Sequence, residues 1–419
     1  MCRYALVVFA LVLGSVAWSA ESAPWPTFRG SDRTAIAPDT GLLKSWPDGG
    51  PKLVWEAEGA GRGYASVAIA GGKIYTIGDG PSTVDDKDEF LMCFDQADGK
   101  QLWLTKTGPA WGGGYKGSRS TPTVDGERVY VVSAQGVLVC CNSASGKELW
   151  RRDFKADFGG DKGDGWGYSE SVLVDGDRVI ATPGGEKSTV VALNKLTGDT
   201  IWQCDRPGNR GAGHASIVIS TIGGTKVYVQ STASGPMGVR AKDGKLLWTY
   251  DIDRTTAVIP TPIIRGDLVF FTAGYGRGGA LLKQVPTGDE IKIEEVYPLK
   301  PALSNRHGGA VLVGDYIYAD SDHNGVPFCA ELMTGEIKWK ERGPGRQSAA
   351  IAFADGCLYV RFQDGTMALI EASPEKQNVL GSFKIPGSGR DPSWSHPVIA
   401  EGKLYLREGD KLLCYDLRT

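Results

Sequence analysis

The chain has 419 residues, of which 41% are hydrophobic and 23% are charged, and its formal net charge is −3. This composition is typical of a folded globular protein and excludes a disordered chain, while the slight acidity argues against nucleic acid as a partner. The 58 glycines, 22 prolines and 12 tryptophans stand out. Because so much glycine without the period of three found in collagen indicates many tight turns, the composition also excludes a helical protein.

Residues 1–23 have the pattern of a secretory signal peptide. Arg3 supplies a positive start, an apolar run extends from Tyr4 to Leu13, and small residues follow. The run is too short for a transmembrane span, and no other stretch approaches about 20 consecutive apolar residues. We therefore expect a signal peptide at 1–23, export to the periplasm or the medium, and no integral membrane segment after cleavage. An uncleaved anchor is the alternative.

A phrase that ends in tryptophan recurs along the rest of the chain. Its copies read DGKQLW, SGKELW, TGDTIW, DGKLLW and TGEIKW, and their last residues are Trp103, Trp150, Trp202, Trp248 and Trp339. Successive tryptophans are 47, 52, 46 and 91 residues apart, and the long gap divides at TGDEIK, where Lys292 takes the tryptophan position. A period of about 47 residues is typical of four-stranded propeller blades, because one blade cannot bury both of its faces without stacked neighbours.

Each period also contains a phrase that predicts two strands around an Asp-Gly or Gly-Gly type of turn. Its eight copies are SVAIAGGKIYTIG, TPTVDGERVYVVS, SVLVDGDRVIATP, SIVISTIGGTKVYVQS, TPIIRGDLVFFTA, GAVLVGDYIYADS, AAIAFADGCLYVRF and HPVIAEGKLYLRE. Eight copies predict an all-β fold, an eight-bladed β-propeller of four-stranded antiparallel blades at residues 51–419, with an N-terminal extension over the propeller at 24–50. The last copy has no tryptophan after it, so we expect a strand around Trp55 to complete the eighth blade and close the ring, which removes free sheet edges.

Seven cysteines remain after the predicted cleavage. Cys93, Cys140, Cys329 and Cys414 fall at one equivalent strand position. Equivalent positions of neighbouring blades should lie farther apart than the Cα separation of about 4.4 to 6.8 Å that a disulfide needs. We therefore predict small buried core residues rather than a disulfide framework. A vicinal disulfide between Cys140 and Cys141 is the alternative, although neighbouring side chains of a strand point to opposite faces.

The repeats, together with the opening WPTFRG at Trp25–Gly30, resemble the pyrroloquinoline quinone (PQQ) repeat family. The resemblance covers nearly all of the chain after residue 23 and implies a propeller. Because the family includes quinoprotein alcohol dehydrogenases and non-enzymatic propellers, such as the lipoprotein of the outer-membrane β-barrel assembly machinery, it implies either an enzyme or a binding protein. The fifth blade, with Lys292, and the seventh, with SPEKQNVLG, depart from the pattern and are expected to pack more loosely or to present a specialised edge.

The residues just before each first strand are expected to line one mouth of the central channel, because the innermost strands of a propeller surround it. Two glycine-rich loops with tryptophan and tyrosine, 108–119 and 158–170, lead to the same mouth. The candidate ligand-binding residues are Tyr64, Arg119, Trp166, Tyr168, Glu170, His214, Arg306, His307, Arg346, Trp394 and His396. A basic and aromatic ring favours an anionic, planar or sugar-like ligand, since guanidinium groups bind carboxylates bidentately and aromatic faces stack. The alternative is a polar lining that only hydrates a narrow channel.

A calcium-loop pattern, DSDHNGVPFCAE, occurs at residues 320–331. Calcium loops of this pattern lie between two helices, but the flanking sequences here predict strands. The pattern therefore favours a hairpin with an Asn-Gly turn. Calcium bound by Asp320, Asp322 and Asn324 in that hairpin loop is the alternative.

PQQ with calcium is the cofactor that a resemblance to the family's dehydrogenases implies. By residue type, Glu170, Arg306 and either Trp166 or Trp394 suit parts of such a site. No motif position supplies the family's base aspartate or its amide calcium ligand. No cofactor is therefore predicted, and no catalytic residue is assigned.

The leading hypothesis is an exported propeller that acts as a binding or scaffold protein. Its site at one channel mouth would take a protein partner or a small anionic or sugar-like ligand. The alternative is a PQQ-dependent alcohol or sugar dehydrogenase. A Ser-His-Asp hydrolase is a remote third hypothesis, because the sequence has no G-x-S-x-G elbow.

Overall fold

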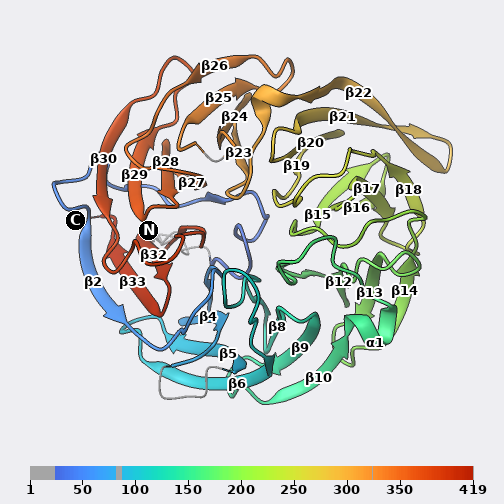
Figure 1. Cartoon of the computed structure of the whole chain (residues 1–419), viewed down its shortest axis with the longest axis horizontal. Helices are drawn as coiled ribbons and strands as arrows, with labels where there is room; N and C mark the ends of the chain where they lie inside the picture. The colour runs from blue at the N-terminus through green and yellow to red at the C-terminus, as the bar shows by residue number, and fades with distance from the viewer. Residues whose placement is uncertain (1–23, 82–86, 323, 419) are drawn as a thin grey trace, which may run out of the picture.

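Eight small sheets arranged in a ring make up the computed structural model, which describes residues 24–81, 87–322 and 324–418 (Figure 1). Each sheet has four antiparallel strands, and one sheet carries a fifth, two-residue strand that pairs in parallel, so the protein is an eight-bladed β-propeller, as predicted. We number the blades 1 to 8 in chain order. The predicted signal peptide at 1–23 lies outside the described residues, and no helix within the described part is long and apolar enough to cross a membrane.

Blades 1 to 4 each use four consecutive strands, and one short helix, α1 (Phe154–Phe158), follows blade 2. Blade 1 contains β3 (Ala68–Ala70), β4 (Lys73–Gly78), β5 (Asp88–Asp95) and β6 (Gln101–Pro109), and blade 2 contains β7 (Thr123–Asp125), β8 (Arg128–Val132), β9 (Val137–Asn142) and β10 (Glu148–Asp153). Blade 3 contains β11 (Leu173–Asp175), β12 (Arg178–Ala181), β13 (Val190–Asn194) and β14 (Thr200–Cys204), and blade 4 contains β15 (Val218–Ile222), β16 (Thr225–Thr232), β17 (Gly235–Arg240) and β18 (Leu246–Thr249).

Blades 5 and 6 repeat this order, with the 3-10 turn η1 (Pro301–Leu303) between them, whereas blades 7 and 8 each include a strand from the N-terminal segment. Blade 5 contains β19 (Ile263–Arg265), β20 (Leu268–Ala273), β21 (Gly278–Thr287) and β22 (Glu290–Lys300), and blade 6 contains β23 (Ala310–Val313), β24 (Tyr316–Asp320), β25 (Pro327–Glu331) and β26 (Ile337–Lys340). Blade 7 contains β27 (Ala349–Ala354), β28 (Cys357–Phe362), β29 (Thr366–Glu371), β30 (Val379–Lys384) and β1 (Ile36–Ala37), and blade 8 contains β31 (Val398–Ala400), β32 (Lys403–Glu408), β33 (Lys411–Asp416) and β2 (Lys52–Ala57).

The middle strands of the blades form the core, because neighbouring blades cover both of their faces. In blade 2, residues Val129 to Val132 of β8 are all buried, whereas the outermost strand β10 alternates between half-buried and exposed residues. The turn between β7 and β8 needs Gly126, whose φ of +55° is disfavoured for residues with a Cβ atom. The predicted hairpins therefore follow from local turn chemistry and strand alternation.

The repeated tryptophans fasten each blade to the next. In blade 1, Trp103 lies opposite Cys93, and a Cβ atom at Gly146 of blade 2 would lie only 2.5 Å from the Trp103 ring. Only glycine fits this contact, which explains the glycine of the repeated phrase. The seven described cysteines are all buried and free, which confirms the prediction that they are small core residues.

Blade 5 corrects the predicted position of its docking residue. Lys292 lies opposite Val285 near the tip of the long β21–β22 hairpin and is exposed. Tyr297 instead lies opposite Leu281 in the docking register, and its ring contacts the site of Gly335 in blade 6, where a Cβ atom would be 3.0 Å away. The prediction that Lys292 takes the docking position was wrong, because the β21–β22 hairpin is longer than in other blades. The extra length shifts the docking position along the strand.

Blade 7 receives its docking tryptophan from the N-terminal segment. Gly381 occupies the docking register of this blade, opposite Leu369. Trp46 fills the space over Gly381 and lies 5.9 Å from the Tyr359 ring, which matches the 5.9 Å between Tyr130 and Trp150 in blade 2. Trp46 is only 7% exposed, so the expectation of loose packing in this blade was wrong.

The ring closes through β2, as predicted. Trp55 lies opposite Cys414 of β33, and its indole nitrogen donates to the Gln96 carbonyl of blade 1 at 3.2 Å. Strand β2 thereby supplies both the outer strand of blade 8 and the contact of this blade with blade 1. Closure of the ring therefore joins segments that are far apart in the sequence, residues 52–57 and 411–416.

Residues 25–37 cross the centre of the ring, where Figure 1 shows the blue N-terminal segment. The Ile69 amide of blade 1 donates to the Trp25 carbonyl at 2.7 Å, and the Phe353 amide of blade 7 donates to the Ala35 carbonyl at 2.8 Å. Between them, the buried Arg33 donates to the carbonyls of Ser171 at 2.8 Å and Ile217 at 3.0 Å. The predicted extension over the propeller thus lies partly inside the ring.

Candidate functional site

A cavity of about 330 Å³ lies at the centre of the ring, and the N-terminal segment contributes Phe28 and Arg29 to its wall. A second cavity, of about 430 Å³, is lined by residues of the same segment, including Thr34, and by residues such as Ile263 of the innermost strands. The first cavity is lined by residues that precede those strands. The N-terminal segment therefore divides the channel into two cavities.

The structure brings most of the predicted ligand-binding residues together in the first cavity, and their role in binding a ligand stays a prediction. They are Tyr64, Arg119, Trp166, His214, Arg306, His307, Trp394 and His396. The residues come from six blades and share one feature, a position just before a first strand. The sequence predicts this position because it recurs before the first strand of every blade.

Three predicted residues do not line this cavity. Tyr168 and Glu170 are buried on the other side of the chain, where the Tyr168 hydroxyl donates to the Pro183 carbonyl at 2.8 Å. Their neighbours Ser169 and Ser171 line the cavity instead, because alternate residues of extended chain point to opposite sides. Arg346 is exposed outside it.

An aromatic group forms one wall. The Trp394 ring lies 4.9 Å from Tyr64 and 4.7 Å from Tyr115, and the His307 ring stacks on it at 4.7 Å with an interplanar angle of 26°. The Trp394 indole nitrogen donates to the Gln363 side-chain oxygen at 2.9 Å, which orients the ring. The wall therefore presents fixed aromatic faces to any planar ligand.

Three arginines make the cavity basic, and none of its described lining residues is acidic. The Arg119 guanidinium lies 5.4 Å from the Tyr64 ring centre. Arg306 lies 4.2 Å from the Tyr275 ring centre and forms an ion pair with Asp322 at 3.0 Å, from outside the cavity. These contacts hold two cations in the wall. Asp322 balances the charge of Arg306 from outside the cavity, whereas the described lining itself contributes no carboxylate.

Arg29 is the third cation and the one that sequence reasoning missed. Its side chain is buried, and burial lowers its pKa to about 10. Nη2 donates to the carbonyls of Thr34 and Ala310, whereas Nη1 has no hydrogen-bond partner among the described residues. No signal in the sequence places Arg29 here, because its position depends on the path of the N-terminal segment through the ring.

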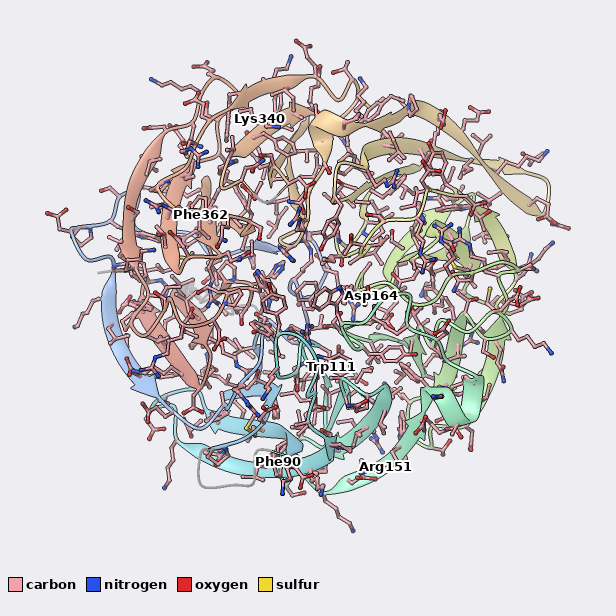
Figure 2. The ribbon with its side chains drawn as sticks, viewed as in Figure 1. Phe90, Trp111, Arg151, Asp164, Lys340 and Phe362 are labelled. Atoms are coloured by element: carbon pink, nitrogen blue, oxygen red, sulfur yellow. The ribbon has the colours of Figure 1, made fainter. Side chains whose placement is uncertain are left out.

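A chain of hydrogen bonds occupies another part of the wall. The Ser169 hydroxyl lies 2.5 Å from His214 Nδ1, and His214 Nε2 lies 2.8 Å from an oxygen of Asp164. Lys162 lies 3.2 Å from the same carboxylate. Figure 2 shows Asp164 and Trp111 near the centre of the ring, while Arg151 and Lys340 lie toward its rim.

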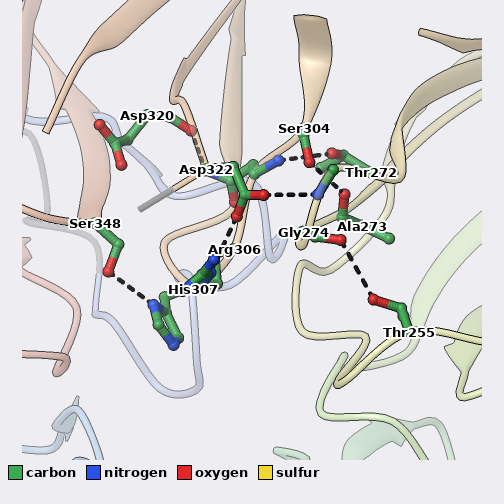
Figure 3. A network of polar contacts seen from close by, with 12 residues as sticks. Thr255, Thr272, Ala273, Gly274, Ser304, Arg306, His307, Asp320, Asp322 and Ser348 are labelled. Carbon is green, nitrogen blue, oxygen red and sulfur yellow. Dashed lines mark hydrogen bonds and ion pairs between the residues drawn. The ribbon is translucent and has the colours of Figure 1, made fainter. Parts of the chain in front are cut away.

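Two of the three predicted calcium ligands, Asp320 and Asp322, lie beside the cavity in the network of Figure 3, and the third, Asn324, is exposed. An oxygen of Asp320 accepts from the Ala349 amide at 3.2 Å, and burial raises the pKa of this carboxyl to about 8, which favours its neutral form. Asp322 engages Arg306 and accepts from the Gly276 amide at 2.7 Å. The described residues contain no group of three or more His, Cys, Asp or Glu suited to a metal ion, so calcium here stays a prediction without geometric support.

The fold and the repeats define a PQQ-like repeat propeller. A family model named for the outer membrane protein assembly factor BamB matches residues 87–341, which is more than half of the chain, and the protein belongs to this family. The predicted resemblance to the PQQ repeat family is thereby confirmed.

Curated relatives carry the same name at low identity. BamB of Shewanella oneidensis is 26% identical over 261 residues, 57% of this chain and 60% of the relative. BamB of Moranella endobia is 22% identical over 284 residues, 65% of this chain and 69% of the relative. The chain thus matches less than two thirds of the length of the first of these proteins.

Solved structures show the same fold. BamB from Moraxella catarrhalis has a TM-score of 0.61 at 12% identity, covering 87% of this chain and 97% of its own. A europium-containing methanol dehydrogenase has a TM-score of 0.64 at 13% identity, covering 92% and 89%. Quinohemoprotein alcohol dehydrogenase from Comamonas testosteroni has a TM-score of 0.61 at 12% identity, covering 94% and 80%. Because BamB and two dehydrogenases resemble the protein to a similar degree and at low identity, this likeness is limited to the fold.

Proposed function

We propose that the protein is a binding or scaffold propeller of the cell envelope whose central cavity holds an anionic, planar group. One observation carries this proposal: three arginines and an aromatic wall line a cavity that has no acidic residue among its described lining. Relatives named as outer membrane assembly factors support an envelope location and a protein partner. The proposed organisation is a signal peptide at 1–23, an extension at 24–50 and a propeller at 51–419.

Electrostatics favour an anion in this cavity. A buried guanidinium is costly unless its N–H groups and its charge are compensated, and Arg29 Nη1 has no protein partner among the described residues. A carboxylate oxygen can accept from this nitrogen, and charge-assisted hydrogen bonds of this kind are about twice as strong as neutral ones. An acidic aromatic group would satisfy the guanidinium and stack on Trp394.

The PQQ-dependent dehydrogenase remains the alternative, and the residues do not fit its calcium ion. Calcium prefers several oxygen ligands, including carboxylates, and the described lining supplies no carboxylate. Glu170, the predicted acidic candidate, faces away from the cavity and accepts from Thr182 at 2.7 and 2.8 Å and from Gln230 at 3.0 Å. No catalytic step through the quinone is therefore derived.

A thermal-shift titration with isophthalate, a planar dicarboxylate, tests the proposed site. We expect saturable stabilisation by isophthalate, none by the neutral isophthalamide, and loss of the effect in Arg306→Gln. Arg265→Gln is the matched control, because Arg265 pairs with Asp315 outside the cavity and the effect should persist. Equal responses to both compounds, or an unchanged response in Arg306→Gln, would refute an anion site.

Two further experiments distinguish PQQ, a protein partner and a free small molecule as the ligand. Stabilisation by PQQ that requires calcium would favour the dehydrogenase, whereas we expect no calcium dependence. A photoreactive amino acid in place of Tyr115, which is 47% exposed, should cross-link to a protein partner in cells, and excess isophthalate should suppress that product. Suppression would assign the anionic group to a protein, and its absence would leave a free small molecule.

A further inference from the structure

The hydrogen-bonded chain of Ser169, His214 and Asp164 has the composition of a nucleophile, a base and an orienting acid. Ser169 and Asp164 come from the loop before blade 3, and His214 from the loop before blade 4. The contacts run from the Ser169 hydroxyl to His214 Nδ1 at 2.5 Å and from His214 Nε2 to Asp164 at 2.8 Å. Such a set is recognised by the roles of its members, not by its sequence order, and here the two ring nitrogens are exchanged relative to the serine-protease triad, in which Nε2 faces the serine.

The carboxylate decides which nitrogen of the ring carries the proton. Lys162 Nζ also lies 3.3 Å from His214 Nε2, but its N–H groups have closer acceptors in both Asp164 oxygens at 3.2 Å and the Ala212 carbonyl at 3.1 Å. Because Asp164 can only accept, His214 Nε2 donates to it, and the lone pair on Nδ1 faces the Ser169 hydroxyl. Burial, reinforced by the nearby charge of Lys162, lowers the pKa of His214 to about 4, so the imidazole is neutral at pH 7. Burial alone would raise the pKa of Asp164, but the hydrogen bond from His214 and the charge of Lys162 hold it below its ordinary value.

Ser169, His214 and Asp164 differ in whether they face the cavity. Ser169 is half-buried, and both it and His214 line the cavity. The His214 and Asp164 side chains are each 7% exposed, but Asp164 does not line the cavity. The nucleophile thus faces the space where a ligand would lie, while the acid is sheltered from it.

A second Ser-His contact in the same region lacks this arrangement. Ser348 lies 2.7 Å from His307 Nδ1, but its hydroxyl donates to the Gln363 side-chain oxygen at 2.9 Å. The proton of Ser348 therefore points away from the imidazole, and Ser348 does not line the cavity. It provides a matched control for Ser169.

We propose that Ser169 is a nucleophile activated by His214, and that the cavity hydrolyses small esters of acidic aromatic alcohols. This activity goes beyond ligand binding, and only the preference for an acidic leaving group rests on the proposed function. Ser169 Oγ bonds to the acyl carbon and gives its proton to Nδ1. The bond from the acyl carbon to the aryl oxygen breaks, and the aryl oxygen receives that proton.

Water completes the cycle. It attacks the acyl-Ser169 ester and transfers a proton to His214 Nδ1, and the acid leaves as Ser169 Oγ regains that proton. Arg119 lines the same cavity, and its positive charge would stabilise the oxyanion of each step. Asp164 and Lys162 act as positioning residues, because they act through the imidazole.

Covalent labelling with phenylmethanesulfonyl fluoride tests the nucleophile directly. We expect one adduct, located on Ser169 by peptide mass spectrometry, which is lost in Ser169→Ala and His214→Asn and kept in Ser348→Ala. Hydrolysis of 4-acetoxybenzoate should fall about 100-fold in Ser169→Ala, the scale that a positioned base supplies. Unchanged melting temperatures of the variants would show that they fold.

The outcomes separate this proposal from the binding site. The sulfonyl fluoride is uncharged, so labelling of Ser169 without any response to isophthalate would support the nucleophile and refute the anion site. Failure to label Ser169 in a folded protein that binds isophthalate would overturn the nucleophile alone. Hydrolysis that is equal in the native protein and Ser169→Ala would also overturn it.

Discussion

Glu170 and Ser169 are neighbours in sequence, yet they lie in different environments. Ser169 faces the central cavity, whereas Glu170 is 2% exposed among polar groups of blades 3 and 4. A sequence position just before a first strand predicts that one of two neighbouring residues lines the channel, since side chains alternate. Which of the two does so depends on the exact path of the loop.

Glu170 makes the stability of the protein depend on pH. Burial raises its pKa to about 7, while the unfolded carboxyl ionises near its ordinary value of 4.5. The folded state therefore keeps a proton that the unfolded state has lost, and the stabilisation that this carboxyl provides below about pH 4.5 is lost as the pH rises to about 7. The loss is roughly 3 kcal/mol at about 1.4 kcal/mol for each pKa unit.

Glu170→Gln should flatten this dependence. We expect urea unfolding free energies to fall less between pH 5 and pH 8 in Glu170→Gln than in the native protein. Burial also raises the pKa of Glu89 to about 7. Glu89 remains in the variant, so part of the pH dependence of the unfolding free energy should persist. The same slope in both proteins would show that Glu170 does not retain its proton on folding.

At the scale of the element, each blade needs one large aromatic residue in its docking register. Local repeats supply tryptophan for five blades, at Trp103, Trp150, Trp202, Trp248 and Trp339. Tyr297 serves blade 5 from a longer hairpin, and Trp46 and Trp55 reach blades 7 and 8 from the N-terminal segment. The apparent gaps in the repeat are therefore filled by residues that a fixed spacing does not find.

Trp46→Ala tests this assignment. Removal of a buried tryptophan costs about 3 to 5 kcal/mol, and we expect a loss of that size in the free energy of unfolding, similar to that of Trp103→Ala. Lys292→Ala is the control, because the exposed Lys292 occupies the position predicted from spacing and should change stability by less than about 0.5 kcal/mol. If Lys292→Ala were as costly as Trp46→Ala, the docking assignment would be wrong.

At the scale of the whole molecule, residues 25–37 hold the ring together from its centre. The segment makes hydrogen bonds to blades 1, 2, 3, 4, 6 and 7. Its Arg29 contributes to the wall of the proposed site, and its Arg33 joins blades 3 and 4. Stability and ligand binding therefore depend on one segment that lies before the first blade.

A protein that begins at residue 38 keeps Trp46 and β2 but lacks this segment. We expect it to lose stabilisation by isophthalate, because Arg29 is absent, and to unfold at lower temperature. The Arg33 guanidinium donates four hydrogen bonds, to Ser171, Ile217, Thr27 and Val172. Arg33→Met in the full chain should therefore cost at least about 3 kcal/mol, as measured by urea unfolding, since each hydrogen bond from a charged group contributes about 1.5 kcal/mol or more. Isophthalate stabilisation that survives the truncation would place the anion away from Arg29.

The sequence by itself determined the number of blades, their hairpins, the closure through Trp55 and the loops that meet at one mouth. These features depend on turn chemistry, strand alternation and a repeat of about 47 residues, all of which are local. Eight of the eleven predicted site residues line the cavity for this reason.

Only the tertiary structure decided the path of residues 25–37, the role of Trp46, the position of Arg29 and the meeting of Ser169 with His214. Each of these joins segments far apart in the chain, or chooses between two faces of one extended segment. Contacts of this kind do not recur with the repeat of the sequence, because they form only on surfaces that the assembled ring leaves exposed.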